Sequence, residues 1–396
     1  MADPLQFMRE GLAALEAMGL DLDCPVVSSA TDAHMVVNGK RVLNLASNNY
    51  LGLANHPELK DAAKRAIDRW GAGAGAVRYV AGTQDLHLEL ERRLAQFKGT
   101  EAAMFAQTGV VANLSALVAL AGSEDVIFSD RLNHASIIDG AQLSRARVVV
   151  YEHCDVLDLQ ARIREHLPGH RRGLIVTDGV FSMDGDIAPL DQLHQVAVDH
   201  GLLLMVDDAH GDGVLGHGRG IAHHFGLQGR IDVEVGTLSK AFGVIGGVIA
   251  GKRLVVDYIR AGGRASQYST GTTPADTAAC LAALDLLERS TALVDRLWDN
   301  TRYFRNGMRA LGFQLGNTET PILPVLLGEA DLAKRLARRL FEEGVFAVAQ
   351  AFPLVPRGQA RIRLIVSAVH ERRDLDFALS VFAAVGRELG VIGAGS

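Results

Sequence analysis

The sequence is poor in cysteine, in aromatic residues and in long apolar runs. Its three cysteines, Cys24, Cys154 and Cys280, are far apart and form no CxxC pair. This spacing excludes a disulfide framework and a cysteine zinc site, and it predicts three separate buried thiols. No apolar run reaches the roughly 18 residues that span a bilayer. The first ten positions already carry acidic and basic residues, unlike a signal peptide. We therefore expect a cytoplasmic protein.

The charge balance is also unremarkable, with 40 basic and 46 acidic residues, a net charge of -6 and no block of lysine or arginine. This composition argues against nucleic-acid and membrane partners. With 48% hydrophobic residues, 42 glycines and 396 residues in all, the chain is typical of a soluble α/β enzyme with more than one lobe.

Apolar runs separated by a helical pattern predict a parallel sheet in the first two thirds of the chain. GLIVTD (173–178) and LLLMVD (202–207) have the length of buried strands, and LDQLHQVAVDHG between them reads as a helix that ends at Gly201. Upstream, DLHLELERRLAQFKG predicts a helix that ends at Gly99. EAAMFAQTGVVANLSALVAL then predicts a strand, a turn at Gly109 and another helix.

The pattern changes after Pro274. Helical periodicity runs from 275 to about 312, and it is followed by the strand ILPVLL, the helix ADLAKRLARRLFEEG and the strands VFAVAQA and ARIRLIVS. We predict an N-terminal helix and arm over 1–45, a large domain over 46–285 with a mainly parallel sheet, and a smaller α+β domain over 286–396.

The segment LMVDDAHGDG (204–213) places Asp207 just past the end of a predicted parallel strand, and Lys240 follows about thirty residues later in the small-residue loop TLSK. A carboxylate that keeps a pyridine nitrogen protonated and a lysine that forms an imine with an aldehyde are what pyridoxal phosphate requires. Because an imine carries no permanent ammonium charge, this chemistry also explains a lysine among apolar neighbours.

Two other interpretations of the same segment stay open. Asp207 and Asp208 could bind a metal with His210, although further ligands at usable spacing are lacking. GDGVLG (211–216) matches the dinucleotide pattern G-x-G-x-x-G, with Asp232 about twenty residues on. Against it, the preceding aspartates would repel a pyrophosphate, and HGRGIAHHFG does not continue as an amphipathic helix.

Several longer motifs resemble one enzyme family, in its order and spacing. They are SNNYLGL (47–53), GAGAGAVRYVAGTQDLHLELE (71–91), SDRLNHASIIDG (129–140), TDGVFSMDGDIAPL (177–190), VDDAHG (206–211), GTLSKAFG (236–243) and VPRGQARIR (355–363). The chain resembles the α-oxoamine synthases, which are fold-type-I pyridoxal phosphate enzymes with an aspartate-aminotransferase-like fold. Within that family it is most similar to glycine C-acetyltransferases and to broad-specificity relatives that make 8-amino-7-oxononanoate.

The resemblance implies a role for each matching residue at the reactive end of the cofactor. Lys240 would form the Schiff base and later remove the α-proton of the amino acid. Asp207 would pair with the pyridinium nitrogen, His210 and Ser182 would bond the phenolic oxygen, and His134 would stack on the ring. These implied roles make Lys240, His134, Asp207 and His210 the expected catalytic residues.

The phosphate and substrate ends follow from the same resemblance. The helix start at Gly109 and Val110 would offer backbone N–H groups to the phosphate, and Thr237 would add a hydroxyl. The partner subunit would add Thr270, with Thr272 beside it, in a homodimer with shared active sites. The residues expected at the substrates are Arg363, which would bind the amino-acid carboxylate, Asn48 beside it, and Val77.

The activity implied is condensation of glycine, or another small amino acid, with an acyl-CoA, giving a 2-amino-3-keto acid and CoA. Acetyl-CoA is the best match, because GTQD and Val77 before Arg78 resemble the glycine-using acetyltransferases. The alternative is an 8-amino-7-oxononanoate synthase or another decarboxylating member that uses alanine or serine and a longer acyl thioester. The sequence leaves open the acyl length, CoA or carrier protein as donor, the decarboxylation and the physiological direction.

Overall fold

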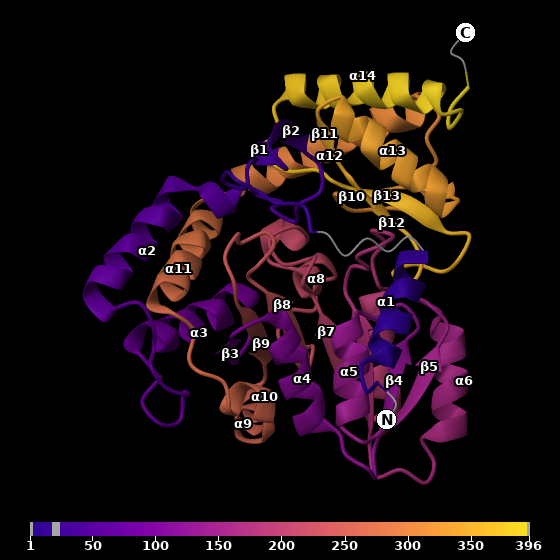
Figure 1. Cartoon of the computed structure of the whole chain (residues 1–396). Helices are drawn as coiled ribbons and strands as arrows, with labels where there is room; N and C mark the ends of the chain where they lie inside the picture. Colours follow the sequence, from indigo (N-terminus) through magenta and orange to yellow (C-terminus); the bar gives the residue numbers. More distant parts are fainter. Residues whose placement is uncertain (1–2, 18–23, 394–396) are drawn as a thin grey trace.

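Two lobes make up the computed structural model, which describes residues 3–17 and 24–393 (Figure 1). The larger lobe is built on a seven-stranded sheet in the order β3-β9-β8-β7-β6-β4-β5. β9 runs antiparallel to both of its neighbours, and all other neighbours are parallel. The strands are β3 (Ala102–Ala106), β4 (Val126–Asp130), β5 (Arg147–Tyr151), β6 (Gly173–Asp178), β7 (Leu203–Asp207), β8 (Val233–Thr237) and β9 (Gly247–Gly251). This sheet confirms the predicted α/β architecture.

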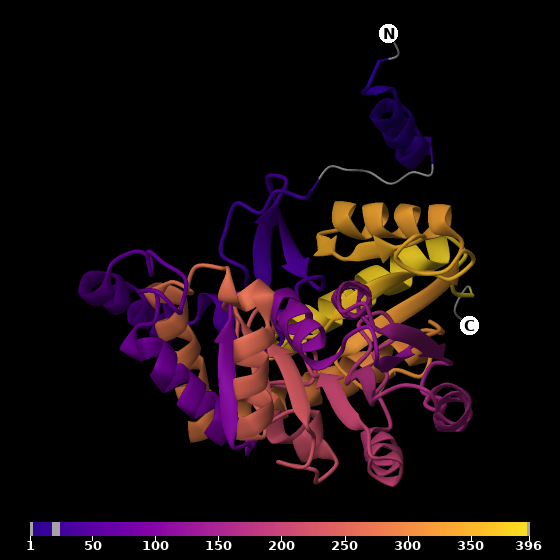
Figure 2. The same ribbon diagram turned by 90° about the horizontal axis from the view of Figure 1, so that it is seen from below.

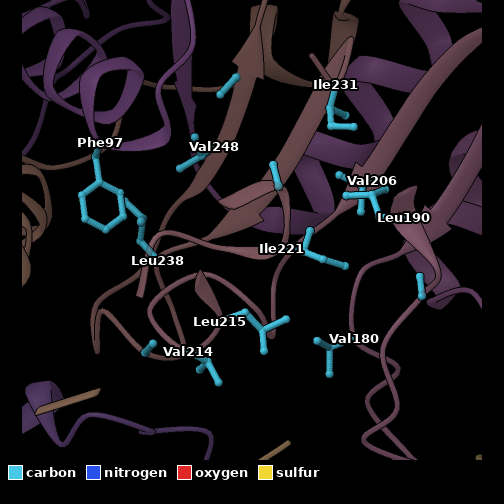
Figure 3. Packing of buried hydrophobic residues seen from close by; sticks show 14 of the residues in the cluster. Phe97, Val180, Leu190, Val206, Val214, Leu215, Ile221, Ile231, Leu238 and Val248 are labelled. Atoms are coloured by element: carbon cyan, nitrogen blue, oxygen red, sulfur yellow. The ribbon is translucent and has the colours of Figure 1, made fainter. Parts of the chain in front are cut away.

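Both faces of the sheet are covered by helices, so its central strands are buried on both sides and mainly apolar. On β6, Leu174 and Val176 face one hydrophobic core and Ile175 faces the other. Figure 3 shows part of the latter core, in which Val206 and Val248 of the sheet lie with Phe97 and Leu190 of two helices. Each such side chain stabilises the fold by about 1.5–3 kcal/mol when fully buried.

The covering helices divide by face. One face packs against α3 (Asp85–Lys98), α6 (Val156–His166), α7 (Leu190–His200) and α11 (Pro274–Arg289), and α2 (Pro57–Trp70) lies against α11. The other packs against α4 (Gly109–Leu120), α5 (Ala135–Leu143) and α9 (Arg253–Gly262). Shorter turns of helix are η1 (Leu53–Asn55), η2 (Gly216–Gly218), α8 (Ile221–His224) and α10 (Arg264–Gln267).

The parallel strands place four polar residues at one edge. β4, β6, β7 and β8 end at Asp130, Asp178, Asp207 and Thr237. Because carboxyl ends of parallel strands meet at the same edge of a sheet, loops that follow these strands surround one site.

The smaller lobe contains two three-stranded sheets. One, in the order β10-β13-β12, is antiparallel; the other, β1-β2-β11, joins the N-terminal arm to the C-terminal region. Their strands are β1 (His34–Val37), β2 (Lys40–Asn44), β10 (Ile322–Gly328), β11 (Val345–Phe346), β12 (Val348–Gln350) and β13 (Ala360–Ile365). The helices are α12 (Ala292–Ala310), α13 (Ala330–Glu342) and α14 (Arg372–Glu388), and they lie at the top of Figure 1.

The structure differs from the sequence patterns at two places in this region. The helical pattern over 275–312 forms two helices, α11 and α12, with a break between them. At the break the Ser290 hydroxyl accepts a hydrogen bond from the Ala292 amide (3.1 Å), so this amide bonds a side chain instead of a carbonyl of the preceding helical turn. VFAVAQA is two strands, because β11 pairs with β2 whereas β12 pairs with β13. The predicted boundary at 285 lies within α11, which ends at Arg289.

The cysteine prediction is only partly correct. Cys280 is buried, but Cys154 is half-buried and Cys24 is exposed. At the N-terminus, α1 (Gln6–Ala17) stands apart from both lobes in Figure 2. None of the helices within residues 3–17 and 24–393 combines the length and apolar character needed to cross a bilayer.

Candidate active site

A cavity of about 210 Å³ opens at the carboxyl edge of the large sheet. It is lined by the loops after β3, β4, β6, β7 and β8, which come from distant parts of the chain. The predicted residues that line it are Gly109, Val110, His134, Ser182, Asp207, His210, Thr237 and Lys240. The fold therefore brings most of the expected cofactor residues into one enclosure.

Lys240 lies in the tight loop after β8. The Gly243 amide bonds the Lys240 carbonyl (3.0 Å), and Gly243 has φ of 72°. A Cβ at Gly243 would lie 2.3 Å from the Ala54 nitrogen, so this loop requires glycine there. Burial lowers the pKa of the Lys240 amine, although Asp207 and Asp178 oppose that shift. A lowered pKa favours the neutral amine, which is the form that attacks an aldehyde.

Asp207 is buried at the end of β7 and is held by two donors. The Asn113 side-chain amide donates to Oδ2 (2.6 Å), and the Ala209 backbone N–H donates to Oδ1 (3.0 Å). Nearby, burial and then the charge of Asp207 raise the pKa of Asp178 well above its usual range. With both of its oxygens accepting hydrogen bonds, Asp207 is arranged as a partner for a pyridinium nitrogen.

His210 is oriented by a tyrosine that the sequence analysis did not single out. Tyr50 Oη and His210 Nδ1 lie 2.7 Å apart, and both side chains are buried. Burial, followed by the charges of Lys240 and Arg363, lowers the pKa of His210 well below its usual range, so its ring is neutral. A bond donated by Tyr50 to Nδ1 leaves an N–H at Nε2 for an oxygen in the cavity.

His134 begins α5 and is joined to Asp207 by a chain of hydrogen bonds. His134 Nδ1 lies 2.7 Å from Ser136 Oγ, which accepts from Asn113 Nδ2 (2.9 Å). Asn113 in turn donates to Asp207. Neither Asn113 nor Ser136 was predicted as a site residue. Asn113 lies within an apolar helical pattern, and Ser136 lies in the first turn of α5.

The start of α4 provides the donors expected for a phosphate. The Thr108 hydroxyl caps the helix by accepting from the Val111 amide (3.1 Å), which leaves the first amides, at Gly109 and Val110, for a ligand. A Cβ at Gly109 would lie 3.1 Å from the Thr237 Cβ, so the cavity is narrow here. Thr237 and Ser239 also line the cavity, and their hydroxyl oxygens lie 2.8 Å apart.

Arg363 lies on β13 and points toward the hairpin after β6. Its Nε donates to the Ser182 carbonyl (2.5 Å), and a terminal nitrogen donates to Asn48 Oδ1 (3.1 Å). Burial lowers its pKa, whereas Tyr50 opposes that shift. Within the described part of the chain no carboxylate pairs with Arg363, in contrast to Arg361, which pairs with Asp184 (2.5 Å). A partly buried guanidinium without an acidic partner favours an anionic ligand.

This donor set fits pyridoxal phosphate. The cavity combines an amine with a lowered pKa, a buried carboxylate, an imidazole at the start of α5 and helix-terminal amides in one enclosure. Each of these groups has a counterpart on the cofactor: the aldehyde, the pyridine nitrogen, the ring face and the phosphate.

Five predicted residues do not line this cavity. Arg363 and Asn48 lie next to it, since Arg363 bonds both Ser182 and Asn48. The other three are Val77, Thr270 and Thr272. Thr270 forms an isolated bridge with Val77, and the Thr272 carbonyl accepts from His87 Nε2 (2.9 Å). The predicted roles of Thr270 and Thr272 depend on a partner subunit. These roles and the substrate-binding role of Val77 stay predictions.

The two alternative interpretations lack the geometry they require. Asp208 turns away from the cavity and accepts from the Ile221 amide (2.8 Å), while Asp212 bonds the buried Lys98. GDGVLG leads into η2 and the four-residue helix α8 rather than a long helix that could bind a pyrophosphate.

Comparison with known proteins agrees with this geometry. The family model described as aminotransferase class I and II matches residues 40–382. The chain belongs to this family. As an α-oxoamine synthase it is similar along its length to "8-amino-7-oxononanoate synthase" of Fervidobacterium nodosum, with 53% identity over 98% of this chain and 99% of the relative. The protein of the same name from Thermosipho melanesiensis is also 53% identical, over 96% of this chain and 97% of the relative.

Solved structures give the same result for this α-oxoamine synthase. Serine palmitoyltransferase of Sphingomonas wittichii superposes with a TM-score of 0.93 at 32% identity, over 99% of this chain and 100% of that one. Another serine palmitoyltransferase (SPT) structure, described as containing pyridoxal phosphate (PLP), has a TM-score of 0.94 at 32% identity. The match covers 98% of this chain and 100% of that one. The fold-type-I architecture and the dependence on pyridoxal phosphate are thereby confirmed. The names of the relatives favour the decarboxylating alternative over the glycine C-acetyltransferase prediction.

Proposed function

We propose that this α-oxoamine synthase condenses alanine with a seven-carbon dicarboxylic acyl thioester, giving 8-amino-7-oxononanoate, carbon dioxide and the free thiol. The observation that carries the proposal is the 53% identity, over nearly the full length, to relatives with that name. The product name supplies the substrates: carbons 8 and 9 correspond to alanine without its carboxylate, and carbons 1 to 7 correspond to the acyl group.

The chain's own residues can be assigned to this reaction. Arg363, with Asn48 beside it, would bind the carboxylate of the amino acid, and the Lys240 amine would take the α-proton. The bound cofactor supplies an electron-withdrawing ring that stabilises negative charge at the amino-acid Cα. Asp207 would pair with the ring nitrogen, and the Nε2 proton of His210 would bond the phenolic oxygen.

Thiol release and carbon dioxide evolution, measured in parallel, test the proposal. Purified holoenzyme is offered alanine, glycine or serine with either pimeloyl-CoA or acetyl-CoA. We expect fastest turnover with alanine and pimeloyl-CoA, with one carbon dioxide per thiol. Preference for glycine and acetyl-CoA, without stoichiometric carbon dioxide, would instead establish the acetyltransferase activity.

We further propose that the active form is a homodimer in which the loop around Thr270 and Thr272 completes the partner's cavity. Large apolar side chains near this loop are 52% to 80% exposed, namely Tyr79, Val80, Leu254, Tyr258 and Tyr268. Such a group is typical of a protein interface. Sedimentation equilibrium of the holoenzyme should give a dimer, and a monomer at micromolar concentration would contradict this arrangement.

A further inference from the structure

A cluster of charged side chains lies behind the cofactor cavity, between the loops that follow β4, β5 and β6. His153, in the loop after β5, has Nδ1 3.0 Å from Asp130 Oδ1 and Nε2 2.7 Å from Asp186 Oδ2. Its ring meets Phe181 edge-on, with centroids 4.3 Å apart. An imidazole bonded at both nitrogens to carboxylates carries both protons and is a cation. Burial opposes the charge, but the two carboxylates raise the pKa of His153 to about 12.

The Asp130 end of the cluster holds the turn that leads to His134. Asp130 Oδ1 accepts from the Leu132 amide (2.8 Å), and Oδ2 accepts from the Cys154 amide (2.8 Å). The turn ends where the His134 amide donates to Asp178 Oδ2 (2.9 Å) and α5 begins. The position of the His134 ring in the cavity therefore depends on where Asp130 lies.

The Asp186 end holds the hairpin that carries Ser182. The base of the hairpin is a bridge between Val180 and Ile187, and the Phe181 amide bonds the Asp186 carbonyl (3.1 Å). Ser182 follows within this hairpin, where its carbonyl receives the bond from Arg363. Movement of Asp186 would displace both a cavity wall and the partner of the substrate-binding arginine.

We infer that His153 is a positioning residue for the cofactor, because its imidazolium joins the turn that carries His134 to the hairpin that carries Ser182. His153 does not line the cavity, so it acts only through these two loops. The inference depends on the pyridoxal phosphate site and not on which amino acid or thioester reacts.

The test measures the dissociation constant of pyridoxal phosphate by absorbance titration of the apoprotein, for His153→Gln, Asp186→Asn and the double variant. Glutamine can bond one carboxylate but cannot join two as a cation. We expect each single variant to raise this constant about tenfold and to lower kcat. Because both changes break the same connection, the double variant should be no worse than the more severe single variant.

Glu152→Gln is the matched control, since Glu152 lies on the same loop but pairs with Arg131 at the surface. It should bind the cofactor as the wild type does. A loss of stability to urea in His153→Gln and Asp186→Asn, with unchanged cofactor affinity and kcat, would leave His153 a purely structural role and overturn the inference. Additive effects in the double variant would also overturn it.

A further outcome concerns metal binding. Asp130, His153 and Cys154 place one possible ligand atom each within 4.8 Å of one another. If Zn²⁺ alone raised the melting temperature of the wild type but not of His153→Gln, the cluster would be a metal centre and the positioning role would be wrong. Because cofactor affinity is measured without substrates, these outcomes are separate from any failure of the proposed reaction.

Discussion

Replacing Tyr50 by phenylalanine tests the buried hydrogen bond that orients His210. The substitution keeps the ring, which packs edge-on against the imidazole with centroids 6.0 Å apart, and removes only the hydroxyl that lies 2.7 Å from Nδ1. Tyr50 is 1% exposed and His210 is 7% exposed, so water does not readily replace the lost partner. The change therefore isolates one polar contact.

The expected magnitude follows from that burial. Leaving a buried nitrogen without a partner costs about 1–3 kcal/mol, so the free energy of unfolding of the apoprotein should fall by this amount. The ring is neutral, because burial and then Lys240 and Arg363 lower its pKa. Without Tyr50, the tautomer with its proton on Nδ1 becomes accessible, and the donor at Nε2 is lost. Loss of that bond to the cofactor should raise the dissociation constant of pyridoxal phosphate about tenfold.

Urea unfolding of the apoprotein and absorbance titration with pyridoxal phosphate measure the two effects separately. Tyr303→Phe is the control, since its hydroxyl bonds Asp376 at the surface of the small lobe. If Tyr50→Phe lost stability but bound the cofactor with wild-type affinity, the contact would be structural and the assignment of the His210 tautomer would be wrong.

Three further outcomes are expected. Lys240→Ala should lack the visible absorbance of the bound cofactor and all turnover, whereas a colourless, phosphate-free wild type would refute the cofactor assignment. Arg363→Lys should raise KM for the amino acid about 10–100-fold, because lysine cannot reproduce the two-pronged contact, and an unchanged KM would place the carboxylate elsewhere. Burial lowers the pKa of His370 to about 4 from 6.5, so the unfolded chain takes up a proton first as the pH falls. The free energy of unfolding should therefore fall by on the order of 3 kcal/mol between about pH 6.5 and 4 because of His370. Urea unfolding at pH 7 and 4.5 should show a larger fall for the wild type than for His370→Asn. An equal fall in the two proteins would contradict this.

The predicted substrate is the point at which sequence motifs were least informative. The acetyltransferase prediction depended on GTQD and on Val77, which forms a bridge with Thr270 and does not line the cavity. A preference among small amino acids comes from shape differences of about one methyl group, each worth roughly 1–3 kcal/mol, and such differences leave no local pattern in a chain.

The sequence alone determined the elements and the reactive groups. Apolar runs of strand length predicted β6 and β7. Gly99 and Gly201 marked the ends of two helices, where they adopt the left-handed conformation that is freely accessible to glycine. The rule that ligands bind at the carboxyl edge of a parallel sheet placed Asp207 and Lys240 at the site. These features depend on periodicity and neighbouring residues, so one chain suffices to find them.

Only the tertiary structure decided which side chains support those groups. Tyr50 and His210 are 160 positions apart, and Asn113 and Asp207 are 94 apart, so no local pattern relates them. The division of 345–351 between two sheets has the same origin, because strand alternation specifies which face is buried but not which strand is the partner. The packing of distant segments, rather than the local conformational preference of each segment, determined how the side chains of the site are oriented.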